Sequence, residues 1–251
     1  MDLTGKVCVI TGASSGIGQS LAIKISLKGA TVVMAARRNS KLITIKEKID
    51  TEGGKCIGIK TDITKKLECK HLIDETINLY GKIDILILGA GVSMWSPFEE
   101  ITDISFFDDL MATNYSGAVH CIHAALPHLI SSKGMIVSCS TAQALVGFTN
   151  HSGYAASKHA LHGFLDTLDM ELNGKVQFLE ACLGWIRGTN MRSNAFGPSG
   201  TKMGETKKKH SSNSVDLDVC TDKIINAILE RKKTIYIPWK LSLIPLSLIH
   251  I

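Results

Sequence analysis

A tyrosine and a lysine stand four residues apart in the stretch GYAASKHALHGF, at Tyr154 and Lys158. Positions i and i+4 lie on one face of a helix, so the phenol and the ammonium can share one small space. A phenol ordinarily ionises near pH ~10, and a neighbouring cation lowers that pKa. The pair has the chemistry of a proton donor, although the commoner explanation is two surface residues on an amphipathic helix.

Three glycines, Gly12, Gly16 and Gly18, follow an apolar run and open a helical pattern in VCVITGASSGIGQSLA. Glycines there let the backbone approach a pyrophosphate, and the start of the helix supplies N–H groups and a partial positive charge. A glycine trio alone also fits a tight turn between a strand and a helix. Because the flanking residues indicate both elements, the pattern favours dinucleotide binding.

The end of the second apolar run indicates which dinucleotide. An acidic residue there binds the ribose 2′-hydroxyl of NAD, whereas an arginine accommodates the 2′-phosphate of NADP. This sequence has Ala36, Arg37 and Arg38 at that point, and no carboxylate. With Ser14 as a further donor to the same phosphate, the sequence predicts NADP(H). Asp62, which ends the third apolar run, is placed either for the adenine amino group or as a helix N-cap.

Short apolar runs alternate with longer helical patterns along the whole chain. The expected strands are 6–10, 30–35, 55–60, 83–88, 134–139, 176–181 and 234–237. The expected helices are 17–28, 41–52, 65–80, 104–130, 153–172 and 216–231. Runs that are apolar on both faces are typical of a parallel sheet covered on both sides. We therefore expect one α/β domain over 1–251, a doubly wound Rossmann fold with a seven-stranded, mostly parallel sheet and helices on both faces.

Two segments depart from this alternation. Residues 192–214 are polar and rich in Gly, Ser and Lys, which is typical of a lid or a disordered loop, and we expect them to form a substrate loop. The apolar tail, residues 239–251, is much shorter than the ~20 residues of a membrane span. The tail fits a subunit interface, a peripheral membrane contact through Trp239 and Lys240, or the extension of a final strand.

The composition excludes several classes of protein. The 251 residues are 45% hydrophobic and 20% charged, which is too apolar for a disordered chain. The net charge of +5 is scattered in short basic clusters, so no nucleic acid is expected as a partner. The seven cysteines contain no C-x-x-C pair and no signal peptide precedes the first strand, which favours an intracellular setting. The nine histidines lack acidic partners in a known ligand pattern, so no metal is expected.

Four features occur in a fixed order along the chain: T-G-x-x-x-G-x-G from Thr11, Asn114 in ATNYSG, a Ser/Thr cluster in IVSCST, and Y-x-x-x-K at Tyr154. Together they resemble the short-chain dehydrogenase/reductase family over residues 3–192. Within it, the Tyr154 stretch and residues 216–233 are similar to the vertebrate-type DHRS7-like reductases. The resemblance implies a cytoplasmic homodimer or homotetramer, with the endoplasmic reticulum membrane as an alternative location through the tail.

The resemblance also implies a role for each matching catalytic residue. Tyr154 is the acid that protonates a carbonyl oxygen, or the base in the reverse direction. Lys158 lowers the Tyr154 pKa and holds the nicotinamide ribose, and Asn114 holds a water that connects Lys158 to solvent. When IVSCST is aligned with the family pattern without gaps, Thr141 supplies the hydroxyl that bonds the substrate oxygen. Ser140, on the other face of the strand, is the fallback. Two donors aimed at a developing alkoxide stabilise the transition state.

The cofactor and substrate positions follow from the same match. Trp95 and Trp185 are expected to wall the substrate pocket beside Thr141. The cofactor is expected to lie against Gly12, Ser14, Ser15, Gly16, Ile17, Gly18, Arg37, Arg38, Asp62, Ile63, Gly89, Ala90, Gly91, Tyr154, Lys158, Gly184, Ile186 and Thr189.

Three departures from the family pattern keep a second function open. Leu88 and Gly89 stand where the family has two asparagines, Thr141 replaces a serine, and Leu183 replaces a proline, with the threonine that follows displaced by one residue. The leading expectation is an NADP(H)-dependent carbonyl reductase or alcohol dehydrogenase acting on a lipophilic substrate such as a steroid, retinoid, keto-lipid or xenobiotic ketone. The alternative is an NADP(H)-binding sensor or scaffold with impaired catalysis.

Overall fold

Seven parallel strands form one sheet in the computed structural model, which describes residues 1–204 and 214–248. The strands are β1 (Val7–Thr11), β2 (Thr31–Ala36), β3 (Lys55–Lys60), β4 (Ile85–Leu88), β5 (Met135–Thr141), β6 (Gln177–Leu183) and β9 (Thr234–Ile237). They lie in the order β3-β2-β1-β4-β5-β6-β9, and every neighbouring pair is parallel. The predicted doubly wound, seven-stranded sheet is confirmed.

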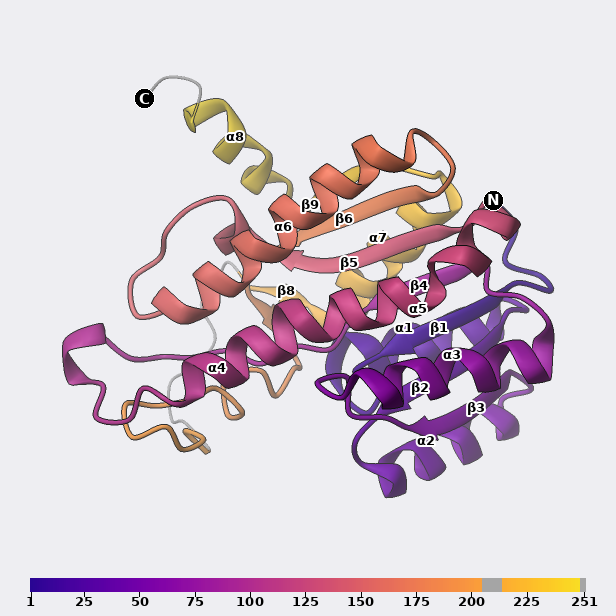
Figure 1. Cartoon of the computed structure of the whole chain (residues 1–251), viewed down its shortest axis with the longest axis horizontal. Helices are drawn as coiled ribbons and strands as arrows, with labels where there is room; N and C mark the ends of the chain where they lie inside the picture. Colours follow the sequence, from indigo (N-terminus) through magenta and orange to yellow (C-terminus); the bar gives the residue numbers. More distant parts are fainter. Residues whose placement is uncertain (205–213, 249–251) are drawn as a thin grey trace.

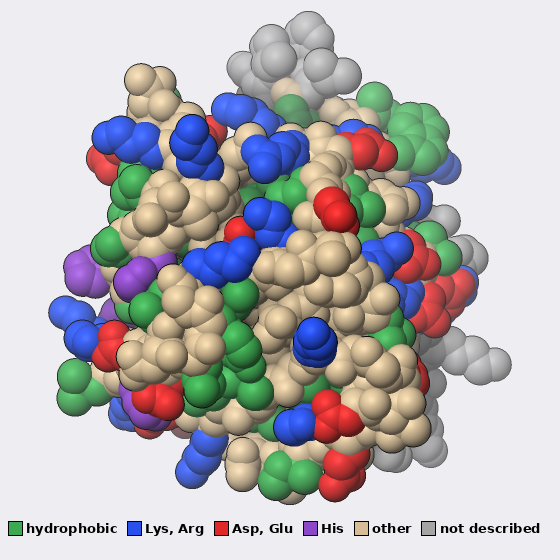
Figure 2. Space-filling view, turned by 90° about the vertical axis from the view of Figure 1, so that its right-hand side faces the viewer, with side chains coloured by type: hydrophobic (Ala, Val, Ile, Leu, Met, Phe, Trp, Pro, Cys, Tyr) green, Lys and Arg blue, Asp and Glu red, His purple; other side chains and the backbone are tan. Residues whose placement is uncertain are grey.

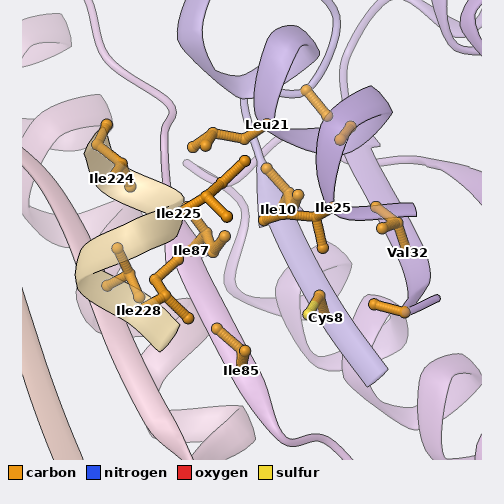
Figure 3. Packing of buried hydrophobic residues seen from close by; sticks show 14 of the residues in the cluster. Cys8, Ile10, Leu21, Ile25, Val32, Ile85, Ile87, Ile224, Ile225 and Ile228 are labelled. Atoms are coloured by element: carbon orange, nitrogen blue, oxygen red, sulfur yellow. The ribbon is translucent and has the colours of Figure 1, made fainter. Parts of the chain in front are cut away.

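Helices cover both faces of this sheet, which is why strands such as β1 and β4 are buried along their whole length. One face carries α1 (Gly16–Leu27), α2 (Asn39–Thr51) and α7 (Leu217–Leu229). The other carries α3 (Lys66–Tyr80), α5 (Gly117–Ser132) and α6 (Ser152–Leu172), which lie in front of the strands in Figure 1. Figure 3 shows Leu21 of α1 and Ile225 of α7 meeting over Ile10 of β1. Each helix layer thus has its own apolar cluster against the sheet.

The order of the strands decides where a ligand can bind. The chain runs outward from β1 through β2 to β3 and then returns to place β4 on the other side of β1. In open α/β sheets the ligand crevice lies outside the carboxyl ends of the strands at such a reversal. β5 and β6 end at Thr141 and Leu183, two residues beyond their expected ends. The segments after β1, β4, β5 and β6 therefore meet at one edge of the sheet.

The helix expected over 104–130 is interrupted in the structure. α4 (Phe106–Met111) passes through one π-helical turn (Ala112–Ser116) into α5. A π turn holds an extra residue and is frequent at functional sites. Here it contains Asn114, whose side chain is buried. No residue pattern distinguishes such a turn from an ordinary α-helix, so the sequence did not indicate it.

The polar segment 192–214 is partly anchored rather than loose. Phe196 is buried, its N–H donates to the Ser93 carbonyl at 2.8 Å, and its carbonyl accepts from the Trp95 N–H at 2.9 Å. A small parallel sheet, β7 (Ile186–Arg187) and β8 (Val215–Asp216), lies at the two ends of the segment. The expectation of a disordered loop is therefore wrong for residues 192–204, because an aromatic side chain and its backbone hydrogen bonds hold them. Residues 205–213 of the predicted substrate loop lie outside the described residues.

The tail forms short helices in place of a strand. After β9 it continues as a 3-10 turn (Trp239–Ser242) and α8 (Leu243–Leu248), which projects from the body of the molecule in Figure 1. The side chains of Trp239 and Leu243 are exposed. No helix in the described part of the chain is long and apolar enough to cross a membrane. Residues 249–251 of the predicted tail lie outside the described residues.

Charges of both signs share the surface on the side where the chain begins. Figure 2 shows Lys and Arg side chains interspersed there with Asp and Glu. Opposite charges at such spacing reduce one another's field, so this face does not present the basic stripe of a nucleic-acid-binding surface.

Candidate active site

The glycine-rich turn after β1 brings three backbone segments too close together for any side chain. A Cβ on Gly12 would lie 2.7 Å from the Ala90 Cα, and one on Gly18 would lie 2.5 Å from the Gly12 carbonyl oxygen. A Cβ on Gly89 would lie 2.7 Å from the Thr11 carbonyl oxygen. Gly12 also has a φ of +68°, in the region that favours glycine. The turn therefore admits only glycine at these positions, and it leads directly into the N-terminus of α1, which favours an anion such as a pyrophosphate.

Thr11 braces the end of β4, where the family's asparagines are missing. Its hydroxyl is buried, donates to the Ile87 carbonyl at 3.3 Å, and accepts from the N–H groups of Gly89 and Ala90 at 3.1 and 3.3 Å. These bonds tie β4 to β1 directly in front of the glycine turn. The replacement of the asparagines by Leu88 and Gly89 thus leaves a strand end that the last residue of β1 holds in place.

The two arginines after β2, Arg37 and Arg38, have different neighbours. Arg38 donates to the hydroxyls of Ser14 and Ser15 in the glycine turn, at 3.0 and 3.3 Å. Arg37 instead approaches Lys202, since burial and then the Arg37 charge lower the pKa of the Lys202 ammonium. The exposed guanidinium of Arg38 and two serine hydroxyls therefore form the donor group beside the glycine turn.

Tyr154 and Thr141 come together at the carboxyl end of β5. Tyr154 lies in the first turn of α6 with its side chain buried. Burial raises the pKa of the phenol well above its usual range, and the hydrogen bond with Thr141 acts in the opposite direction. Ser140 lies elsewhere, because its hydroxyl is one of the groups that lower the pKa of the Glu180 carboxyl. Of the two candidate hydroxyls, Thr141 is the one beside the tyrosine.

Lys158 is buried one helical turn after Tyr154. Its ammonium donates to the Cys139 carbonyl at 3.3 Å and lies 6.0 Å from the centre of the Tyr154 ring. Burial lowers the pKa of the ammonium. Burial is the largest influence on the Tyr154 pKa, and the lowering expected from Lys158 stays a prediction.

Asn114 connects the segment after β4 to α6. Its amide nitrogen donates to the Val92 carbonyl at 2.8 Å and to the Ser157 hydroxyl at 2.9 Å, and its amide oxygen accepts from the Val92 N–H at 2.9 Å. A Cβ on Gly91 would lie 3.3 Å from the Asn114 oxygen and 3.9 Å from the Lys158 nitrogen. The bonds of the Asn114 side chain therefore fix the position of α6, and with it Tyr154 and Lys158, against the end of β4.

Asp62 and Ile63 are engaged by the protein itself. The Asp62 carboxylate accepts from the N–H and the hydroxyl of Thr64 at 3.0 and 2.9 Å, which is a turn ahead of α3. Ile63 is buried against α5, where a Cβ on Gly117 would lie 2.7 Å from its Cδ1. Of the two roles expected for Asp62, the N-cap is wrong, because Lys65 caps α3, and the contact with the adenine stays a prediction.

The segment after β6 reaches the glycine turn from the other side. The Thr189 methyl lies 3.6 Å from the position that a Cβ on Gly16 would take, and its hydroxyl donates to the Ile186 carbonyl at 3.0 Å. Gly184 faces away, since a Cβ there would meet Pro238 and Leu241 at 3.2 and 3.4 Å. The displaced threonine thus still lies beside the glycine turn, whereas Gly184 packs on the tail.

Aromatic rings gather around Tyr154. The ring centres of Trp95 and Trp185 are 5.5 Å apart, and His151 lies 4.8 Å from Trp95 and 6.3 Å from Tyr154. Phe148 joins them at 5.6 Å from His151. The two tryptophans were expected here, whereas Phe148 and His151 were not. They stand in an irregular segment before α6, where no periodic pattern singles them out.

His162 contradicts the expectation that the histidines lack acidic partners. Its Nδ1 lies 2.9 Å from the Glu180 carboxylate and its Nε2 lies 3.4 Å from Asp166. These three are the group among the described residues whose ligand atoms lie close enough to hold a metal ion. The pattern was missed because Glu180 comes from β6, eighteen residues further along the chain. An imidazole that bridges two carboxylates is in the first place an ion pair.

We expect Glu180→Gln to lower the free energy of unfolding by about 1–3 kcal/mol near pH 6 and by less near pH 8.5. The hydrogen bond to Glu180 raises the His162 pKa, so its stabilisation is complete below the unfolded-state pKa and is lost as the pH rises through the folded-state pKa. Urea unfolding at both pH values measures the difference. Asp166→Asn, which changes the exposed partner, is the control, and an equal loss at both pH values would contradict the ion pair.

The chain belongs to the short chain dehydrogenase family, whose profile matches residues 6–198. It is 40% identical over 196 residues to an "11-beta-hydroxysteroid dehydrogenase-like 2" of Arabidopsis thaliana, covering 78% of this chain and 63% of that protein. The chain spans less than two thirds of the length of the curated relatives it matches first.

Two solved structures share the fold. A short chain dehydrogenase/reductase from Burkholderia phymatum, solved in complex with NAD, superposes with a TM-score of 0.85 at 22% identity, covering 98% of this chain and 93% of that one. An alcohol dehydrogenase from the archaeon Thermococcus sibiricus, complexed with 5-hydroxy-NADP, gives a TM-score of 0.79 at 22% identity, covering 92% of this chain and 95% of that one.

Proposed function

We propose that this chain is an NADP(H)-dependent oxidoreductase that interconverts a carbonyl and a secondary alcohol on a lipophilic substrate. One observation carries the proposal: the buried Lys158 ammonium lies 6.0 Å from the centre of the buried Tyr154 ring at the carboxyl end of β5, where the Thr141 hydroxyl acts to lower the pKa of the phenol. The glycine turn, at the same edge of the sheet, leads into the N-terminus of α1, which favours the pyrophosphate of a dinucleotide. The two structural relatives solved with nicotinamide cofactors support this class of ligand.

When bound, the reduced nicotinamide supplies the hydride. Tyr154 and Thr141 donate hydrogen bonds to the substrate oxygen, and as charge develops on that oxygen the phenol releases its proton to it. Lys158 then faces a phenolate, so the ammonium stabilises the deprotonated tyrosine. The bonds of Asn114 to Val92 and Ser157 keep α6 in place during the transfer. In the reverse direction the phenolate accepts the proton of the alcohol.

Arg38 supports NADP(H) rather than NAD(H). It donates to Ser14 and Ser15, so a planar, bidentate donor lies beside the glycine turn at the end of β2. Ala36 leaves no carboxylate there to accept from a ribose 2′-hydroxyl. The 2′-phosphate of NADP(H) would replace the serine hydroxyls as the acceptor for the guanidinium.

Arg38→Ala is expected to weaken the binding of NADPH by about 10–100-fold and that of NADH by less than about threefold. A charge-assisted hydrogen bond is worth about 1.5–3 kcal/mol, and ~1.4 kcal/mol corresponds to a factor of ten. Fluorescence titration of each nucleotide measures the two dissociation constants. Arg37→Ala is the matched control, with the smaller expected effect since Arg37 approaches Lys202. Equal losses of NADPH and NADH affinity in Arg38→Ala would exclude the phosphate contact.

The rings around Tyr154 support a lipophilic substrate. Trp95, Phe148 and Trp185 present large apolar surfaces beside the proposed reacting group. The curated relatives named as hydroxysteroid dehydrogenases point to substrates of the same character. The finer placement with DHRS7-like reductases remains part of this proposal, as does the choice among steroid, retinoid, keto-lipid and xenobiotic ketone.

The alternative is a sensor or scaffold that binds NADP(H) without efficient turnover. This alternative was based on the residues that depart from the family pattern, which are Leu88, Gly89, Thr141 and Leu183. Thr11 braces the strand end after Leu88, and Thr141 keeps a hydroxyl at the tyrosine. These two contacts favour the enzyme. A protein that binds NADPH yet reduces no ketone in a broad panel would support the sensor.

A further inference from the structure

We propose that the substrate carries a carboxylate remote from its reacting carbonyl, and that Arg192 binds this carboxylate; the inference rests on the proposed function. Arg192 lies in the anchored part of the segment after β6, with its guanidinium carbon 4.4 Å from the centre of the Trp95 ring. Trp95 in turn contacts His151, whose ring lies 6.3 Å from that of Tyr154. An unbroken series of ring contacts therefore leads from Arg192 to Tyr154.

The guanidinium of Arg192 has a hydrogen-bond donor without an acceptor. Its Nε is buried and has no hydrogen-bond partner among the described residues, and no carboxylate of residues 1–204 and 214–248 forms an ion pair with it. Burying an N–H without an acceptor is unfavourable. With its carbon 4.4 Å from the ring centre, the guanidinium lies over Trp95, a contact that favours a cation. Such an incompletely bonded fork is suited to a carboxylate, which accepts two parallel N–H bonds.

The positive charge at this end of the site comes from Arg192. His151 is buried, and burial, followed by repulsion from Arg192, lowers the pKa of its imidazole. Its Nδ1 lies 2.8 Å from the Thr149 carbonyl, so a neutral ring donates there. His151 therefore serves as a flat, uncharged surface between the guanidinium and the tyrosine. A substrate with an apolar body and one acidic end matches this order of groups.

The backbone around Arg192 is held on both sides. The Arg192 carbonyl accepts from the Ala195 N–H at 3.1 Å, and Phe196 is bonded to the segment that carries Trp95. The cation is thus placed by the same contacts that anchor residues 192–204. An isolated surface arginine would lack this support and would offer a carboxylate little affinity.

Three matched long-chain ketones test the proposal: 8-benzoyloctanoate, its primary amide and its methyl ester. Wild-type protein is expected to reduce the acid with a kcat/KM about 10–100-fold above that of the amide and the ester, mainly through KM. Arg192→Gln removes the charge but keeps a flat amide. In this variant the kcat/KM for the acid is expected to fall to that for the ester, while the kcat/KM for the ester stays unchanged. Arg192→Lys should recover only part of the preference, since it lacks the fork. Arg187→Gln, an arginine paired with Asp216, is the control that should keep the preference.

Binding without turnover separates this inference from the proposed function. Quenching of tryptophan fluorescence by the acid and by the ester, followed in the presence of NADP⁺, reports affinity even if no ketone is reduced. Tighter binding of the acid in wild type, lost in Arg192→Gln, would support the carboxylate site whether or not turnover occurs. Equal affinity for acid and ester, or an amide bound as tightly as the acid, would overturn it. If the ester is reduced but the acid has no advantage, the proposed function stands and the carboxylate site fails.

Discussion

Tyr154→Phe is expected to lower kcat/KM for carbonyl reduction by about 10²–10⁴-fold, the range for loss of a positioned general acid. The substitution deletes one oxygen and keeps the ring that packs with Met94, Phe106 and Phe196. The remaining Thr141 hydroxyl still bonds the substrate oxygen, but phenylalanine has no proton to give to that oxygen. The loss should therefore appear mainly in kcat rather than in KM. Initial rates of NADPH oxidation with a saturating lipophilic ketone measure it.

The affinity for NADPH provides the control for this variant. Tyr154→Phe should bind NADPH within about threefold of wild type, because the phosphates are expected at the glycine turn and at Arg38. Its stability should fall by only about 1 kcal/mol, the worth of one hydrogen bond. A variant that keeps its fold and its NADPH affinity and still reduces ketones at the wild-type rate would remove Tyr154 from the reaction.

Thr141→Val is expected to cost about 10²–10³-fold in kcat, the usual result of removing one donor to a developing oxyanion. Valine has nearly the shape of threonine but lacks the hydroxyl beside the Tyr154 phenol, and it also loses the bond that this oxygen accepts from the Gln143 N–H at 3.3 Å. Thr141→Ser restores the hydroxyl and should lose less than about tenfold. The ratio of the kcat values of the two variants separates the contribution of the hydroxyl from that of the methyl group.

Ser140→Ala is the matched control for this series. Its hydroxyl lies with Glu180 on the other side of β5, so the rate should change by less than about twofold. A fall in Ser140→Ala as large as that in Thr141→Val would mean that the neighbouring hydroxyl, and not Thr141, bonds the substrate.

Much of the scaffold could be predicted because it follows local rules. Apolar runs alternating with helical patterns predicted seven strands, and the structure has them in one parallel sheet. The positions of Gly12 and Gly18 were predictable because a Cβ at either would lie within 2.7 Å of backbone atoms, so only glycine fits. Tyr154 and Lys158 share a helix, so their proximity follows from spacing alone.

What could not be predicted depends on contacts between distant segments. Which arginine of the pair faces Ser14 is set by how β2 ends against the glycine turn, and both arginines are equal in the sequence. The partnership of His162 with Glu180 joins a helix to a strand, and the stacking of Arg192 on Trp95 joins two irregular segments. The bonds from Thr11 to the segment after β4 likewise appear only once β1 and β4 lie side by side.

The transfer of a labelled hydride tests the proposed oxidoreductase most directly. NADPH carrying deuterium at each of the two C4 positions of the nicotinamide in turn would be incubated with the wild-type protein and a panel of lipophilic ketones. We expect one of the two labels, and not the other, to appear on the carbinol carbon of the alcohol, with product from Tyr154→Phe reduced by about 10²–10⁴-fold. Saturating NADPH binding without labelled alcohol from any ketone would contradict the enzyme and leave the NADP(H)-binding sensor in its place.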